Sequence, residues 1–317
     1  MSSQSVLLIG AGGYLGRVVV KEFLNQKSKF ARVAILVDPS KVNKFAEEAK
    51  SGMEVVIGSF LEPGSFKGFN TVISMLGNHA MALQPAIIDA AVSAGVTHFY
   101  PSEFGADIGQ GPYLTNRYFR DKHLTRHHLE KTAEEYKNKG FGYTLIITGG
   151  FAEFAAHPAF GIYTDEAKFE FFGSETKREP FTAVVDIAKY TVASVSMLPS
   201  PGVALESPCR TFRIPTATYS WKEIIDIISR IQGKEYTRIY RPNSEALELA
   251  SKYAKEGDVD SELLYSLKAI IGNPNGESIS KPWDNDKFPD IVPESLEYLS
   301  RSYWEQSSNL RLQEFLQ

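Results

Sequence analysis

The chain has little of what secreted, membrane-spanning or nucleic-acid-binding proteins need. It contains one cysteine, Cys209, so an internal disulfide is excluded and a reducing compartment is expected. No run approaches the roughly 20 apolar residues that cross a bilayer, and the start of the chain has no basic segment of a signal peptide. The 34 Lys and Arg residues are outnumbered by 38 Asp and Glu residues, which leaves no basic surface for a phosphate backbone. We therefore expect a soluble, cytoplasmic protein with no membrane or nucleic-acid partner.

Short apolar runs alternate with amphipathic segments through about residue 150. This alternation is typical of βαβ units, which form mostly parallel sheets. A long charged stretch over residues 115–139 favours a helix that ends at Gly140. The expected strands span residues 6–9, 33–37, 54–57, 71–75, 98–100 and 143–147. The pattern predicts an α/β fold, with a doubly wound parallel Rossmann sheet in residues 1–150.

Past residue 150 the pattern changes, because glycine, proline and aromatic residues become more frequent and strands less regular. Residues 151–317 are therefore interpreted as a smaller C-terminal α/β region that binds substrate. An apolar helix over residues 184–198 is expected to return to the first domain. A second helix over 220–232 is expected to begin with a capping box formed by Ser220 and Glu223. The polar residues 273–288 are expected to form a surface loop.

A glycine-rich turn, Gly10-Ala-Gly-Gly-Tyr-Leu-Gly16, follows the first expected strand and opens the first expected helix. Glycines at this spacing allow a tight turn and bring backbone N–H groups close to a pyrophosphate, while the start of the helix adds partial positive charge. A glycine pattern alone is more often an ordinary loop, but its place between strand and helix favours dinucleotide binding. The expected cofactor-binding residues here are Gly10, Gly12, Gly13, Tyr14, Leu15, Gly16 and Arg17.

The choice between NADH and NADPH depends on the end of the second expected strand. Asp38 stands there, where a carboxylate can accept hydrogen bonds from the ribose hydroxyls of NADH. Lys41 and Arg17 are nearby cations that could instead neutralise the 2′-phosphate of NADPH. Both cations could equally be solvated surface side chains, so these residues leave the preference open.

Three polar residues could form a hydride-transfer site. Tyr118 and Lys122 are four residues apart, which places both on one face of the expected helix. A lysine beside a phenol lowers the pKa of the phenol, as a proton donor to a developing alkoxide requires. Ser102 follows the fifth expected strand, at the edge where ligands gather in doubly wound folds. A Tyr/Lys pair at helical spacing also occurs by chance, and Ser102 could simply cap a turn.

Two histidines on the same helix suggest a metal site less well than a substrate contact. His123 and His127 are four residues apart, with Glu130 nearby. No glutamate directly follows His123 in the metalloprotease pattern, and no Cys/His spacing resembles a zinc site. We therefore expect no metal and interpret His123 as solvated or facing the substrate.

Several motifs of the chain occur together in one known family, and the most specific is Phe99-Tyr-Pro-Ser-Glu-Phe-Gly105. The others include Gly10-x-x-Gly13-Tyr-Leu-Gly16, Thr71-Val-Ile-Ser-Met-Leu-Gly77, Lys122 followed by Arg126 and Glu130, Phe172-Gly173, Asp186-Ile-Ala-Lys-Tyr-Thr191 and Ser220-Trp-Lys-Glu-Ile224. Together they extend over nearly the whole chain and resemble the motifs of isoflavone reductase-like and NmrA-like proteins, which are atypical short-chain dehydrogenases/reductases.

This resemblance implies an NADPH-dependent reductase of isoflavonoid, phenylpropanoid or other aromatic metabolites. It places the family's helix lysine at Lys122, with a catalytic or nicotinamide-ribose role, and it extends the cofactor site to Leu76 and Gly77. It also implies that segments after residue 150 line the substrate pocket. The aromatic residues expected to contact the substrate are Phe151, Phe154 and Tyr163, with ordinary core packing as the alternative for each.

Three departures from the family pattern leave the function partly open. Gly149-Gly150 stand where the family often has asparagines, which leaves more room above the nicotinamide. Asp38 stands where plant members usually have arginine, so an NADPH preference does not carry over. Many members lack a tyrosine at the position of Tyr118, whose presence is similar to ordinary short-chain dehydrogenases. One hypothesis is hydride transfer to a carbonyl, enone or quinone-methide-like carbon of an aromatic secondary metabolite. The other is an NmrA-like dinucleotide sensor that binds a protein partner without turnover; retention of Tyr118 and Lys122 favours the enzyme.

Overall fold

The computed structural model describes residues 4–201, 203, 205–275 and 277–295. Its larger sheet has seven parallel strands in the order β11-β6-β5-β4-β1-β2-β3. The strands are β1 Ser5–Ile9, β2 Arg32–Val37, β3 Glu54–Ile57, β4 Thr71–Ser74, β5 His98–Tyr100, β6 Gly142–Ile147 and β11 Cys209–Arg213. The chain moves from β1 outward to β3 and then returns to β4 on the other side of β1. The predicted doubly wound parallel sheet is confirmed. The direction in which successive strands are added reverses between β1 and β4, and ligands bind at this point in such folds.

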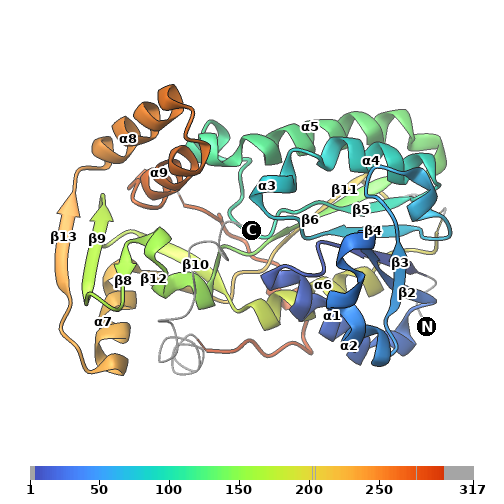
Figure 1. The fold of residues 1–317 in the computed structure, drawn as a ribbon, viewed down its shortest axis with the longest axis horizontal. Coiled ribbons are helices and arrows are strands. Elements are labelled where there is room, and N and C mark those ends of the chain that lie inside the picture. The colour runs from blue at the N-terminus through green and yellow to red at the C-terminus, as the bar shows by residue number, and fades with distance from the viewer. Residues whose placement is uncertain (1–3, 202, 204, 276, 296–317) are drawn as a thin grey trace.

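Helices cover both faces of this sheet because successive strand residues point to opposite faces. In β1, Val6 and Leu8 pack in the core that includes α1 and α6, whereas Leu7 and Ile9 pack in the core that includes α4 and α5. The helices beside this sheet are α1 Tyr14–Asn25, α2 Ala46–Lys50, α3 Asn78–Met81, α4 Gln84–Ser93, α5 Arg120–Glu135 and α6 Val184–Ser196. Figure 1 shows α4 and α5 on one side of the sheet and α1 on the other.

Two elements from beyond residue 150 complete this part of the molecule. Strand β11 pairs with β6, and α6 packs beside α1, as Val19 and Ile187 share one buried core. The elements of the first sheet thus come from both sides of residue 150. The division into regions 1–150 and 151–317 stays a prediction, and residues 296–317 of the second lie outside the described residues.

Among the described residues, a second region consists of two three-stranded sheets and three α-helices, drawn at the left of Figure 1. Its strands are β7 Gly150–Phe151, β8 Ile162–Tyr163, β9 Lys168–Phe172, β10 Arg178–Thr182, β12 Ala217–Ser220 and β13 Thr237–Arg241. Its helices are α7 Trp221–Gln232, α8 Asn243–Glu256 and α9 Val259–Ile271. The predicted capping box at the start of α7 is present. Trp221 lies at the centre of an aromatic core with Phe171 and Phe181.

One sequence-based expectation about local structure is wrong, and a second is right only in part. The long helix begins at Arg120, not at residue 115, because Asn116 accepts a hydrogen bond from the Tyr118 backbone N–H and caps a short 3₁₀ helix first. Residues 273–275 and 277–288 are mostly a surface loop, as expected, but part of this segment is buried. Ile279 and Phe288 are buried, and Phe288 packs against Tyr190, so apolar side chains anchor this polar segment across the sheet. Among the described residues, no helix is long and apolar enough to span a membrane.

Candidate active site

The glycine-rich turn joins β1 to α1 in a conformation that requires glycine at its two ends. Gly10 has a φ of +80°, and a Cβ there would lie 2.6 Å from the Met75 carbonyl. A Cβ at Gly16 would lie 2.2 Å from the Gly10 carbonyl oxygen, so only glycine lets the helix approach the strand. Gly13 precedes the first turn of α1 and has no side chain to cap it. The N–H groups of this turn therefore fit an anionic group such as a pyrophosphate.

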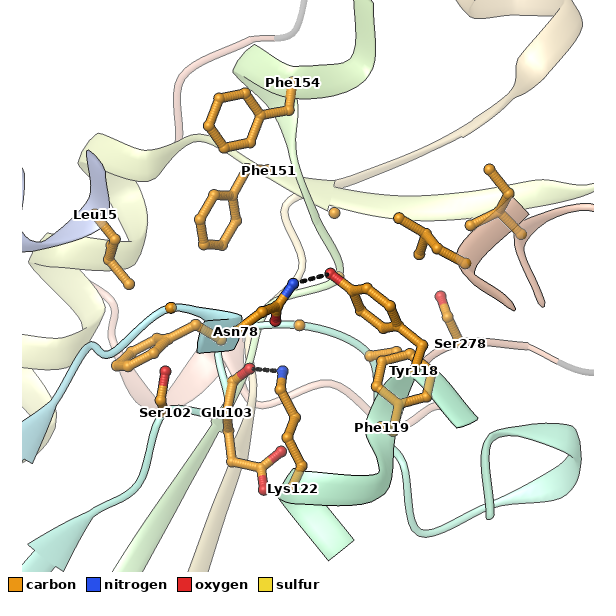
Figure 2. A pocket seen from close by; sticks show the side chains of 18 of the residues that line it. Leu15, Asn78, Ser102, Glu103, Tyr118, Phe119, Lys122, Phe151, Phe154 and Ser278 are labelled. Atoms are coloured by element: carbon orange, nitrogen blue, oxygen red, sulfur yellow. Dashed lines mark hydrogen bonds between the residues drawn. The ribbon is translucent and has the colours of Figure 1, made fainter. Parts of the chain in front are cut away.

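A cavity extends from this turn into the second region of the molecule. Gly13 is among its lining residues. Figure 2 shows Leu15 on one side and Tyr118 on the other, with Lys122 below and the rings of Phe151 and Phe154 above. Its wall also includes Leu76, Gly77 and Trp221. One cavity thus connects the expected cofactor turn, the expected catalytic pair and an aromatic wall.

Lys122 is held at the edge of this cavity by the loop that follows β5. Its Nζ donates a hydrogen bond to the Glu103 backbone carbonyl, and the residue is 8% exposed. The Glu103 carboxylate accepts two hydrogen bonds from Arg126, at 2.8 and 3.0 Å. Burial lowers the pKa of Lys122, partly opposed by the charge of Glu103, while the charge of Arg126 lowers it further. Glu103 therefore uses its carbonyl to position Lys122 and its side chain to anchor Arg126.

Tyr118 has a different partner from the one the sequence suggests. Its hydroxyl accepts a hydrogen bond from Asn78 Nδ2 at 3.2 Å, and no described contact joins it to Lys122 (Figure 2). Burial raises the pKa of Tyr118, an effect that the bond from Asn78 partly opposes. The expectation that Lys122 lowers this pKa is wrong, and the phenol stays protonated at neutral pH. Sequence reasoning missed Asn78, although its place just after β4 at the ligand-binding edge of the sheet was a usable signal.

Ser102 lines the same cavity but ties two loops together. Its Oγ donates to the Leu76 carbonyl at 2.7 Å, and its backbone N–H donates to Gln84 Oε1 at 2.8 Å. These bonds hold the loop after β5 against the loop after β4 and against the first residue of α4. The hydroxyl proton is thus directed at the Leu76 carbonyl.

Asp38 lies exposed at the carboxyl end of β2, as the sequence suggested. Its carboxylate accepts hydrogen bonds from the backbone N–H and the hydroxyl of Ser40, and so caps a 3₁₀ helix, Pro39–Phe45. These bonds, and to a lesser extent the charge of Lys41, lower the pKa of Asp38. Arg17 is exposed and donates to the Gly12 carbonyl at 3.2 Å. The three residues considered for cofactor preference, Asp38, Lys41 and Arg17, lie outside the lining of the cavity.

The residues expected to contact substrate divide into two groups. Phe151 and Phe154 line the cavity, and the Phe154 ring lies 4.6 Å from that of Tyr14. Tyr163 and His123 do not line it: the Tyr163 hydroxyl accepts from Lys268 Nζ at 3.3 Å, and His123 Nε2 lies 3.1 Å from the Tyr113 carbonyl oxygen. Among the described residues, no group of three or more His, Cys, Asp and Glu side chains could hold a metal ion.

Comparisons with known proteins place this chain in a family. A model of the NmrA-like family matches residues 2–276. An isoflavone reductase homolog from Zea mays is 27% identical, over 93% of this chain and 97% of its own.

Solved structures show the same fold. The complex of leucoanthocyanidin reductase from Vitis vinifera with NADPH has a TM-score of 0.72 at 21% identity and covers 95% of this chain and 99% of its own. A structure described as AtPrR2 with NADP⁺ and (+)pinoresinol also has a TM-score of 0.72, at 18% identity, and covers 96% of this chain and 99% of its own.

Proposed function

This chain belongs to the NmrA-like family, and on that premise we propose that it is an NAD(P)H-dependent reductase of an aromatic metabolite. The observation that carries the proposal is the single cavity that joins the glycine turn, Lys122 and an aromatic wall. The proteins named above support it, since two are described as a reductase or a reductase homolog and the third as a complex with NADP⁺ and (+)pinoresinol.

Residues that follow β1 and β4 of the large sheet suit a nicotinamide dinucleotide. The N–H groups at the start of α1, after Gly13, would hold the pyrophosphate. Leu15, Leu76 and Gly77 line the adjoining part of the cavity and would hold the nicotinamide end. The bound cofactor supplies a hydride to an electrophilic carbon of the substrate.

Lys122 and Tyr118 would manage the proton that balances this step. When a carbonyl, enone or quinone methide gains a hydride at carbon, the electron pair moves to oxygen and that oxygen takes a proton. The buried ammonium of Lys122 would stabilise the developing negative charge, because charge interactions are strong in a site that excludes water. Tyr118, a phenol at neutral pH, would donate the proton or orient a water that does.

Turnover of candidate substrates tests this proposal. We expect loss of reduced-nicotinamide absorbance when the chain is mixed with NADH or NADPH and an aromatic ketone, an enone or a benzylic ether. If calorimetry shows that the cofactor binds but no member of this panel is reduced, the proposal fails in favour of a dinucleotide sensor. A matched assay without protein corrects for spontaneous reduction.

A further inference from the structure

A polar cluster lies at the side of the cavity away from the glycine turn. Tyr113, Glu179 and Ser278 come from three distant segments, yet all three line the cavity and are 2%, 6% and 4% exposed. Figure 2 shows Ser278 beside Tyr118 and on the opposite side of the pocket from Leu15. The residues around the cluster in this wall are apolar, including Leu267 and Ile270. The cluster is thus a polar spot in an apolar surface.

Lys177 supports this cluster from outside the cavity lining. Its Nζ lies 2.6 Å from Glu179 Oε1 and donates to the Ile270 carbonyl at 2.9 Å. It also donates to the Tyr113 hydroxyl at 3.4 Å. The ammonium and the carboxylate compensate each other, so the cluster offers polar atoms to the cavity without a net charge.

One polar atom of the cluster, Ser278 Oγ, makes no hydrogen bond of normal geometry with the described residues. Glu179 Oε1 makes none either, but it is paired with Lys177 Nζ at 2.6 Å. The Tyr113 hydroxyl lies near both: burial, then the charge of Glu179, raises the pKa of Tyr113, while Ser278 lowers it. Buried polar atoms normally have partners, because leaving one without a hydrogen bond costs about 1–3 kcal/mol. A ligand in the cavity can supply the missing partner.

We propose that Glu179, Tyr113 and Ser278 form a subsite that binds a neutral hydroxyl group of the substrate. A hydroxyl can donate to Glu179 and accept from Ser278, which matches both atoms. Because Lys177 compensates the charge of Glu179, neither a carboxylate nor an ammonium of a ligand would find a net counter-charge here. The inference rests on the proposed function only in that the same cavity is taken to bind the aromatic substrate, whose hydroxyl would then lie away from the nicotinamide.

Calorimetry with matched chalcones tests the subsite without requiring turnover. The full chain, saturated with oxidised cofactor, is titrated with chalcone and its 4-hydroxy, 4-methoxy and 4-carboxy derivatives. We expect 4-hydroxychalcone to bind about tenfold more tightly than chalcone or the methoxy derivative, the size of one hydrogen bond to a charged group. The carboxy derivative should bind most weakly.

Two variants locate the effect. Glu179→Gln should abolish the preference for the hydroxyl. Ser278→Ala should reduce the preference to about threefold, because the lost neutral hydrogen bond contributes an amount near the lower end of the range for such bonds. Ser278 has no ion pair, so its variant stays informative if Glu179→Gln, which leaves Lys177 without its carboxylate, fails to fold. Ser266→Ala, at a buried serine outside the cavity lining, should leave the preference unchanged.

The outcomes separate this inference from the proposed function. Equal affinities of the wild type for chalcone and 4-hydroxychalcone, or no binding of any of the four compounds, would overturn the subsite. A preference that survives in both Glu179→Gln and Ser278→Ala would also overturn it. A preference that the variants remove, in a protein that reduces no aromatic acceptor, would support the subsite while the proposed reductase fails.

Discussion

The seven-stranded sheet and the pair of three-stranded sheets differ in how their strands pair. In the large sheet, neighbouring strands are parallel throughout. In the second region, β10 is parallel to β7 and antiparallel to β12, and β9 is parallel to β13 and antiparallel to β8. The first region thus repeats one regular pattern, whereas the second combines two kinds of strand pairing. The cofactor turn belongs wholly to the first region, and the aromatic wall to the second.

The candidate active site lies where the two kinds of structure meet. Lys122 comes from α5, beside the large sheet, whereas Phe154 and Trp221 belong to the second region. The Tyr14 ring of the glycine turn lies 4.6 Å from that of Phe154. We therefore expect variants in the first region to change cofactor binding or chemistry, and variants in the second region to change substrate binding.

The largest effect is expected from Lys122→Ala. Removing the buried ammonium should lower kcat by on the order of a hundredfold or more, because a positioned charge at the reacting oxygen is lost. Lys268 offers a matched control, since it is also a buried lysine whose pKa burial lowers, but it lies outside the cavity lining. Lys268→Ala should keep kcat within a few-fold of the wild type. Wild-type turnover by a correctly folded Lys122→Ala protein would remove Lys122 from the mechanism.

The stability of the protein should depend on pH through Glu153, which connects the segment after β7 to α6. This buried carboxylate accepts from the Val184 N–H at the start of α6, at 2.9 and 3.1 Å, and burial raises the pKa of Glu153 to about 7. Because the pKa is higher in the folded state, its contribution to stability is complete below about pH 4.5 and is lost as pH rises through 7.

The free energy of unfolding of the wild type should therefore fall by about 2 kcal/mol between pH 5 and pH 8 through Glu153. In Glu153→Gln this contribution to the pH dependence should be absent. Urea unfolding of both proteins at the two pH values measures this difference. If the wild type and the variant show the same pH dependence, Glu153 does not titrate in this range.

Patterns that are local in the sequence could be predicted, and contacts between distant residues could not. Expected strands 54–57 and 98–100 match β3 and β5, because short apolar runs between turn residues are local signals. Tyr118 was placed on the long helix because spacing alone cannot reveal that Asn116 caps a separate 3₁₀ turn. The family resemblance implies that aromatic residues after residue 150 line the pocket, and on that basis Tyr163 is expected there. Its actual partner, Lys268, is about 105 residues away in the chain, and no local pattern encodes that contact.

The site followed the same rule. The glycine turn and Lys122 could be found from spacing and from resemblance to a family. Glu179 and Ser278 could not, because their nearness depends on how β10 and the segment after α9 fold against each other.

Cofactor preference should shift by about tenfold in Asp38→Arg. An arginine at the end of β2 can pair with the 2′-phosphate of NADPH, and loss of the carboxylate removes its repulsion; together we expect at least 1.4 kcal/mol, a factor of ten. The wild type should bind NADH at least as well as NADPH. Fluorescence titration of both reduced cofactors measures the ratio, with Asp260→Arg on α9 as an exposed control. A strong wild-type preference for NADPH that Asp38→Arg leaves unchanged would show that Asp38 does not face the ribose.

The smallest effect is expected at the aromatic wall. Phe154→Leu should raise the KM for an aromatic substrate about fivefold while changing the cofactor Kd less, because ring contacts contribute about 1 kcal/mol. Phe172→Leu removes an equally buried ring that lies outside the cavity lining, and it should leave KM unchanged. A larger change in cofactor Kd than in KM for Phe154→Leu would contradict the assignment of the second region to substrate.

The central claim is that one cavity brings a cofactor bound at the glycine turn against an aromatic ligand held by the second region. Transfer of deuterium from reduced nicotinamide labelled at C4 to an aromatic acceptor tests it most directly. With chalcone, an aromatic ketone or a benzylic ether present, mass spectrometry should find a reduced product that carries deuterium at carbon. If calorimetry shows both cofactor and aromatic ligand bound, and no acceptor gains deuterium, the claim is contradicted.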